Sequence, residues 1–202
     1  MNKPPHHNRS LLDQAYRFAE QSHYEAEHSQ HVMNLSNRLF EQLESLHALD
    51  GRARSLLSCS ALLHDIGWIT GQAKHHKQSM RMILSDRTMD LTELDRQMIA
   101  VIARYHRKAL PKPTHPVYRD LTDAQRQQVQ LLSALLRMAD GLDRSHKSIV
   151  KDIEVLIAGR MVDVICYVRT QADSEMCAAK KKSDLFETAT GYTCQFTSRI
   201  SA

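Results

Sequence analysis

Apolar residues recur every three or four positions over most of the first 148 residues, which is the period of amphipathic helices. The spacing predicts helices over residues 10–23, 25–46, 52–65, 75–85, 92–108 and 122–143. Asp50-Gly51 predicts a turn, and Thr92 with Asp95 has the spacing of a capping box. Thr122 or Asp123 is expected to cap the last of these helices. The first three quarters of the chain therefore predict a helical body.

The period changes from helical to alternating after about residue 149. Apolar residues alternate with other residues over 153–157 and again over 162–168, and Gly159-Arg160 between them indicates a turn. This pattern predicts a hairpin, followed by a short helix near 173–187 and a third strand at 192–196. The fold class is mainly α, with a helical domain over 10–148, a small α+β appendage of two or three strands over 149–202, and a flexible tail over 1–9.

Composition and charge narrow the class of protein. The 202 residues are 42% hydrophobic and 25% charged, and the net charge is +4. That charge is too weak to indicate nucleic-acid binding, and no aromatic residues alternate with basic ones. It suits an anionic small molecule if the cations converge on one site. No apolar run approaches the roughly 20 residues that a membrane span needs.

The cysteines and the N-terminus bear on the cellular compartment. Cys59, Cys166, Cys177 and Cys194 form no CxxC pair, so we interpret them as reduced thiols. The opening MNKPPHHNRS has no apolar segment typical of a signal peptide. We therefore expect a cytoplasmic protein.

Polar residues continue the core-facing stripes of four predicted helices. His28 falls on the stripe of Val32, Leu35 and Leu39, and His64 continues the line of Leu57 and Ala61. The other two stripes continue into His106 and Asp140, and Asp65 lies about 100° around its helix from His64. A buried carboxylate costs several kcal/mol unless it is paired or bound to metal. One shared divalent cation would satisfy all these groups, and a mixed nitrogen and oxygen ligand set suits Zn, Mn or Fe.

A simpler interpretation applies to any single histidine, namely a hydrogen-bonded residue of the core or surface. We place most of the remaining histidines in that class: His6, His7, His23, His31, His47, His115 and His146. A metal site is favoured because a His or an Asp continues the core-facing stripe in each of four predicted helices.

Several segments carry a resemblance to a known family. They are HSQHVMNLSNRLFEQLESLHAL, ALLHDIG, HHKQS, ARYHRKALPK and LLRMADGLDRSH. Together they resemble the C-terminal region of the exopolyphosphatase/guanosine pentaphosphate phosphohydrolase family, over roughly residues 10–148. The adjacent His64-Asp65 pair, with His28 and Asp140, also looks like the HD superfamily of metal-dependent phosphohydrolases.

The resemblance implies an HD-domain helical bundle and a ligand set. It places His28, His64, Asp65 and Asp140 as ligands of a first divalent ion. It implies His76 and His106 as ligands of a second ion, with His75 as the alternative to His76. Which of Mn, Fe, Zn, Mg or Ni binds, and whether one ion or two, stays open. Gln78 stands where family members often have a further histidine.

The implied activity is hydrolysis of a phosphoester or phosphoanhydride by metal-activated water. Asp65 is the expected catalytic residue, since a carboxylate can bridge two ions and orient the water. The substrate would be a nucleotide or another small phosphorylated compound. Exopolyphosphatase activity is not implied, because that active site lies in the actin-like ATPase-type domains of the family, which the chain does not match.

Cations close to the implied ligands are candidates for substrate binding. Lys77, Arg107 and Arg144 are the expected contacts to phosphate, although cations at helix ends also answer the helix dipole. Lys108 and Lys147 fit the second explanation better. The alternative function is a regulatory or ligand-binding HD module, and exposed strands of the C-terminal appendage would allow a homodimer.

Overall fold

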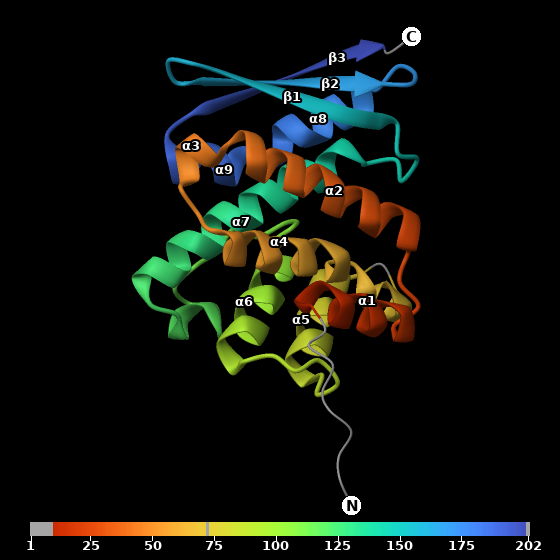
Figure 1. The fold of residues 1–202 in the computed structure, drawn as a ribbon, viewed down its shortest axis with the longest axis vertical. Helices are drawn as coiled ribbons and strands as arrows, with labels where there is room; N and C mark the ends of the chain where they lie inside the picture. The colour runs from red at the N-terminus through yellow and green to blue at the C-terminus, as the bar shows by residue number, and fades with distance from the viewer. Residues whose placement is uncertain (1–9, 72, 201–202) are drawn as a thin grey trace, which may run out of the picture.

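The computed structural model describes residues 10–71 and 73–200, so the predicted flexible tail over 1–9 lies outside the described residues. Figure 1 shows a helical body with a three-stranded sheet at one end. The helices of the body are α1 (Leu11–Gln21), α2 (Ala26–Gln42), α3 (Glu44–His47), α4 (Gly51–Leu63), α5 (His75–Ser85), α6 (Glu93–Arg104) and α7 (Asp123–Leu142). Two short 3-10 helices lie among them, η1 (Ile66–Thr70) and η2 (Tyr118–Asp120).

The C-terminal part contributes β1 (Val150–Ala158), β2 (Met161–Val168), α8 (Asp173–Lys182), α9 (Asp184–Thr190) and β3 (Thr193–Ile200). Strands β1 and β2 form the predicted antiparallel hairpin, and β3 returns through α8 and α9 to pair in parallel with β2. The sheet order is β1-β2-β3. The predicted fold class, mainly α with a small α+β appendage, is confirmed.

Local side-chain chemistry sets several boundaries. The Thr122 hydroxyl accepts from the backbone N–H of Gln125, whose side chain returns the bond in a capping box, so Thr122 caps α7. Asp50 caps α4, and the helix begins at Gly51, so the predicted turn there is the start of a helix. The predicted helix over 25–46 divides into α2 and α3, and Ala48, the residue that follows α3, lies in the left-handed region with φ 49°. The helix expected near 173–187 likewise divides at Ser183 into α8 and α9.

The buried core joins the helical body to the C-terminal part. Helix α2 packs on α4 and α7, β1 packs on α2, and both α8 and α9 pack on α7. A Cβ added at Gly141 of α7 would lie 2.7 Å from the Cα of Ala179 in α8. Because only glycine permits so close an approach, α8 is held tightly against the last turn of α7.

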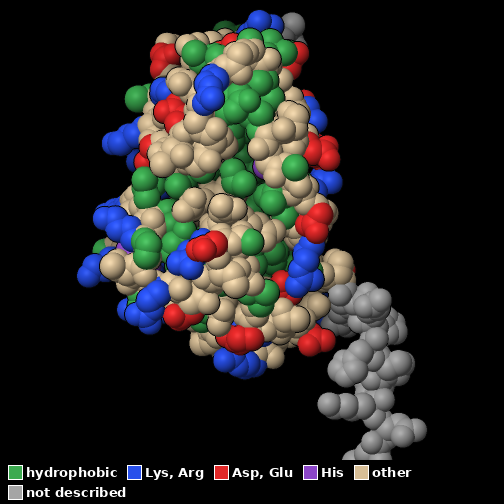
Figure 2. Space-filling view, turned by 90° about the vertical axis from the view of Figure 1, so that its left-hand side faces the viewer, with side chains coloured by type: hydrophobic (Ala, Val, Ile, Leu, Met, Phe, Trp, Pro, Cys, Tyr) green, Lys and Arg blue, Asp and Glu red, His purple; other side chains and the backbone are tan. Residues whose placement is uncertain are grey.

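A small number of large apolar side chains are exposed on the described part of the chain. Leu156, Ile157 and Ile200 of the sheet are exposed, and Figure 2 shows apolar side chains at the surface at the end of the molecule where the sheet lies. A homodimer through this sheet stays a prediction. Among the described residues, no helix has the length and apolar character needed to cross a membrane. All four cysteines are free, and Cys177 is the exposed one.

Candidate metal centre

A first group of side chains meets where α2, α4 and α7 converge. His28 comes from α2, His64 and Asp65 follow the last residue of α4, and Asp140 lies in the last turn of α7. The Nε2 of His28 lies 3.6 Å from Oδ1 of Asp140 and 4.0 Å from Oδ2 of Asp65. The Nε2 of His64 lies 3.6 Å from Oδ2 of Asp65 and 3.9 Å from Oδ1 of Asp140. All four predicted ligands of the first ion therefore lie together, and all four residues are buried.

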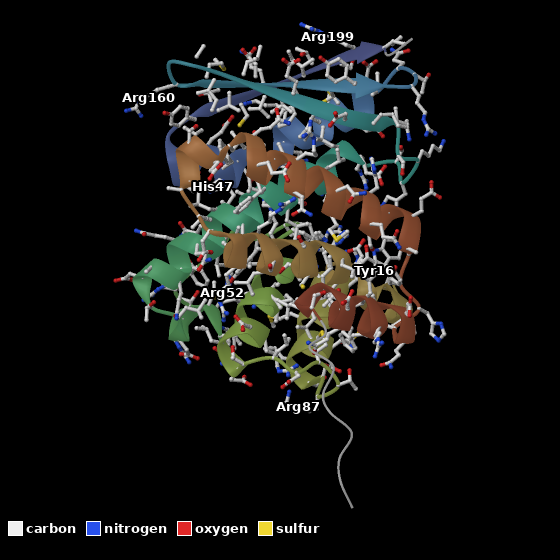
Figure 3. The ribbon with its side chains drawn as sticks, viewed as in Figure 1. Tyr16, His47, Arg52, Arg87, Arg160 and Arg199 are labelled. Atoms are coloured by element: carbon white, nitrogen blue, oxygen red, sulfur yellow. The ribbon has the colours of Figure 1, made fainter. Side chains whose placement is uncertain are left out.

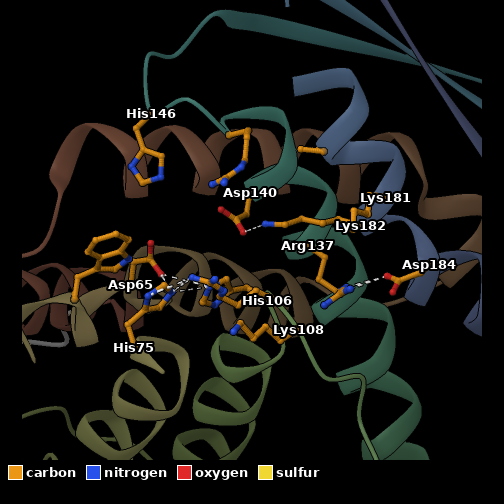
Figure 4. Close-up of a pocket in the computed structure, with 14 residues that line it drawn as sticks. Asp65, His75, His106, Lys108, Arg137, Asp140, His146, Lys181, Lys182 and Asp184 are labelled. Carbon is orange, nitrogen blue, oxygen red and sulfur yellow. Dashed lines mark hydrogen bonds and ion pairs between the residues drawn. The ribbon is translucent and has the colours of Figure 1, made fainter. Parts of the chain in front are cut away.

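A second group shares Asp65. Its other oxygen, Oδ1, lies 3.1 Å from Nε2 of His75 and 3.4 Å from Nε2 of His106. These two nitrogens are 3.3 Å apart, and Figure 4 shows His75 and His106 converging on Asp65. The ligand atoms of each group lie within the span of one ion: His28, His64 and Asp65 in the first, Asp65, His75 and His106 in the second. Asp65 thus turns one carboxylate oxygen toward each group.

The choice between His75 and His76 depends on the packing of α5 onto η1. His75 lies against Asp65, whereas the His76 ring stands 5.9 Å from that of His75 and 6.3 Å from that of His106. The backbone N–H of Gly67 donates to the Ser79 hydroxyl at 3.0 Å, and a Cβ at Gly67 would lie 2.4 Å from the His75 carbonyl oxygen. This close contact sets the start of α5 so that its first residue, not its second, faces the cluster.

Outer hydrogen bonds orient three of the imidazoles. The Nδ1–H of His28 donates to Oδ2 of Asp143 at 2.8 Å. His64 donates in the same way to the Ala61 carbonyl at 2.6 Å, and His106 to the Ala103 carbonyl at 2.7 Å. In a neutral imidazole, donation from Nδ1 leaves the lone pair on Nε2, the atom that each ring presents to the cluster.

The hydrogen bonding of the first group shows whether its residues are suited to a metal ion. Among the described residues, Nε2 of His28 and Nε2 of His64 are buried and have no hydrogen-bond partner. Buried polar atoms are nearly always satisfied, so two such nitrogens facing two carboxylates are suited to a divalent cation.

Burial and charge perturb the ionisable groups of the cluster. Burial lowers the pKa of His64 and lowers that of His106 well below its ordinary value. For Asp140, burial would raise the pKa, but the Lys182 ammonium and the nearby imidazoles hold it well below its usual range. For Asp65, His64, His75 and His106 similarly outweigh burial and hold its pKa low. Both carboxylates are thus ionised and available as ligands at neutral pH.

The cluster forms one wall of a cavity of about 440 Å³. Many of its other lining side chains are basic: Arg107, Lys108, Arg137, Arg144, Lys181 and Lys182. Of the predicted substrate-binding residues, Arg107 and Arg144 line the cavity, and Lys77 is exposed and is not among the lining residues. Lys108, which we interpreted as a helix-end cation, also lines the cavity. Other arginines, such as Arg87, Arg160 and Arg199, project from the outside of the molecule (Figure 3).

Several residues of the site were not anticipated from the sequence. Lys182 of α8 forms an ion pair with Oδ2 of Asp140, and Arg137 pairs with Asp184 at 2.7 Å (Figure 4). His146 stacks on His28 with ring centroids 3.6 Å apart. Asp143 follows Asp140 by three residues, a helical spacing from which its role beside His28 could have been predicted. Lys182 lies 42 positions from Asp140, and no local pattern connects the two.

The fold and the site define a helical protein whose buried His and Asp side chains, drawn from separate helices, open into a cation-lined cavity. Residues 13–173 match the family described as Ppx/GppA phosphatase, domain III. The chain belongs to this family, and the resemblance seen in the sequence is confirmed. No curated protein matches the sequence.

Proposed function

We propose that the protein is a metal-dependent phosphohydrolase of the HD type, acting on a phosphoester or phosphoanhydride of a nucleotide or another small phosphorylated compound. Membership of a phosphatase family supports a hydrolase in general. The observation that carries the proposal is the pair of buried, unsatisfied nitrogens, Nε2 of His28 and Nε2 of His64, which face Asp65 and Asp140 at the wall of a cationic cavity.

Each group of the cluster has a distinct part in the proposed reaction. His28, His64, Asp65 and Asp140 would hold a first divalent ion, and Asp65, His75 and His106 a second. Such ions lower the pKa of bound water toward about 7 and neutralise phosphate oxygens. Asp65 orients the attacking water through its carboxylate, because its two oxygens face the two groups. Arg107 and Arg144 bind phosphate oxygens at the cavity wall, where a planar guanidinium can donate two hydrogen bonds.

The chain can instead be a regulatory module that binds a phosphorylated ligand without cleaving it. Cationic side chains already contact one ligand residue of each group, which favours this alternative. Lys182 pairs with Asp140, and Arg107 donates to Nε2 of His75 at 3.1 Å. These contacts would have to rearrange before both ions bind.

Hydrolysis assays with defined metals separate the two functions. Purified protein would be incubated with Mn²⁺, Co²⁺, Ni²⁺, Zn²⁺ or Mg²⁺ and with nucleotides, nucleoside polyphosphates, cyclic dinucleotides and polyphosphate. We expect metal-dependent release of phosphate or nucleotide, and a loss of at least roughly a thousandfold in Asp65→Ala, comparable with removal of other essential catalytic groups. Hydrolysis that Asp65→Ala retains would show that the activity does not come from this cluster. Ligand binding without turnover would favour the module.

A further inference from the structure

The last residue of α8 places a positive charge directly on a candidate metal ligand. The Lys182 ammonium pairs with Oδ2 of Asp140, while Oδ1 of the same carboxylate faces His28 at 3.6 Å and His64 at 3.9 Å. The lysine side chain is 21% exposed and the aspartate side chain 11% exposed, so solvent screens the pair only weakly. One carboxylate is thus shared between a fixed cation and the proposed metal position.

Helix α8 is anchored, so the lysine is held near Asp140. At its start, the buried Glu175 carboxylate accepts from the backbone N–H of Ser145 at 3.2 Å. Near its end, Lys180 donates to Glu187 at 2.6 Å and to the Cys194 carbonyl at 2.9 Å. Together with the close approach of α8 to α7 at Gly141, these bonds confine Lys182 to the edge of the cluster.

The cluster needs this charge when no metal is bound. Asp65, Asp140 and Asp143 are all buried within it. Buried carboxylates without a compensating charge strongly destabilise a fold. We propose that Lys182 is a tethered cation that takes the place of the metal's charge on Asp140, so that the ammonium and the ion compete for this carboxylate. This inference rests on the proposed metal centre and adds a regulator of its affinity.

Two effects of Lys182 on metal binding oppose each other, and their sizes decide the outcome. As a hydrogen-bond partner it orients Asp140, and losing such a partner typically weakens metal affinity about 10- to 100-fold. As a charge it repels the ion. Even two unit charges about 6 Å apart, at an effective dielectric constant of about 20, change an equilibrium constant roughly a hundredfold, and a divalent ion doubles that energy. Repulsion therefore exceeds orientation, and Lys182 makes the metal site weaker and more readily exchanged.

Metal binding would also change the charge of the cavity. Repulsion by the ion moves the ammonium away from Oδ2 and toward the cavity, which Lys182 already lines beside Lys181 and Arg144. An anionic ligand then gains a further cation in the metal-bound protein alone. Binding of metal and of phosphate are thereby coupled in the same direction.

The test measures Mn²⁺ affinity by isothermal titration calorimetry on the full chain. Lys182→Met removes both charge and hydrogen bond, and Lys182→Gln removes the charge but keeps a donor for Oδ2. We expect both variants to bind Mn²⁺ at least tenfold more tightly than the wild type. Lys147→Met removes an exposed lysine that does not line the cavity; it is the matched control and should change affinity less than about threefold. Lys182→Arg should keep the affinity of the wild type within a similar factor.

Thermal unfolding in EDTA measures the effect of the same charge on the metal-free protein, where the lysine is expected to stabilise the fold. Lys182→Met should melt at a lower temperature than the wild type without metal, yet bind metal more tightly. If Lys182→Met binds Mn²⁺ more weakly and Lys182→Gln binds like the wild type, the lysine only orients Asp140 and the inference is overturned. If the wild type binds no Mn²⁺ at all, the proposed metal centre fails instead, so the two failures are distinguishable.

Discussion

The two ligand groups of the cluster share Asp65 but differ in how their remaining ligands are held. In the first group, His28 and His64 both have their Nδ1–H fixed, by Asp143 and by the Ala61 carbonyl, and the Asp140 carboxylate completes the set. In the second, His106 is fixed in the same way, but His75 lies 3.1 Å from the Arg107 guanidinium. A preorganised first site beside a second that contacts a cation predicts unequal metal affinities.

Removing one histidine from each group should have the largest effect. His64→Ala removes a ligand of the first site, and its metal affinity should fall by more than roughly a hundredfold, the upper end of what loss of an outer partner costs. His75→Ala should leave one ion per chain with affinity close to that of the wild type. Calorimetric titration with Mn²⁺ gives both stoichiometry and affinity. Equal losses in the two variants would mean that the groups do not differ.

The outer partner of His28 should have the next largest effect. Asp143→Asn keeps the size of the side chain but removes the charge that orients the imidazole, and affinity at the first site should fall about tenfold. Glu25→Gln is a matched control, because Glu25 pairs with His146 at 2.9 Å and not with a candidate ligand. The same titration compares them. An unchanged affinity in Asp143→Asn would show that the first site does not depend on its outer hydrogen bond.

The smallest expected effect is on the pH dependence of stability. Burial would lower the pKa of His28, but the neighbouring carboxylates of Asp140, Asp143 and Asp65 outweigh it and raise this pKa to about 9. Protonated His28 therefore stabilises the metal-free fold fully below its ordinary pKa of 6.5, and this stability is lost as the pH rises toward about 9.

The melting temperature of EDTA-treated protein should fall by a few degrees over this interval. The metal-loaded protein should show no such fall, because the ion displaces the proton from His28. Thermal unfolding followed by circular dichroism at several pH values provides the measurement. A metal-free melting temperature that is constant from pH 6.5 to 9 would contradict the protonated state of His28.

The helical body could be predicted well from the sequence because its signals are local. Stripes such as Val32, Leu35 and Leu39 mark the buried face of α2, and His28 continues that face into the cluster. The hairpin and the return of the chain to a third strand also followed from the alternating pattern.

The remaining details of the site depend on tertiary packing. His75 and His76 are adjacent at the start of α5, and the contact between Gly67 and α5 decides which one faces Asp65. Helix α8 supplies Lys182 to the site because α8 packs closely on α7, with Ala179 against Gly141. This packing brings Lys182 to Asp140, although the two residues are 42 positions apart in the sequence. No periodicity encodes such a contact, so the sequence alone did not predict that the C-terminal part supplies a wall of the cavity.

The most direct test of the central claim is the amount of divalent metal bound per chain after equilibrium dialysis, measured by mass spectrometry of the metal. We predict at least one ion of Mn, Fe or Zn per wild-type chain, and none in a folded variant that carries His64→Ala and Asp65→Ala. Wild-type protein that binds no more metal than this variant would contradict the account.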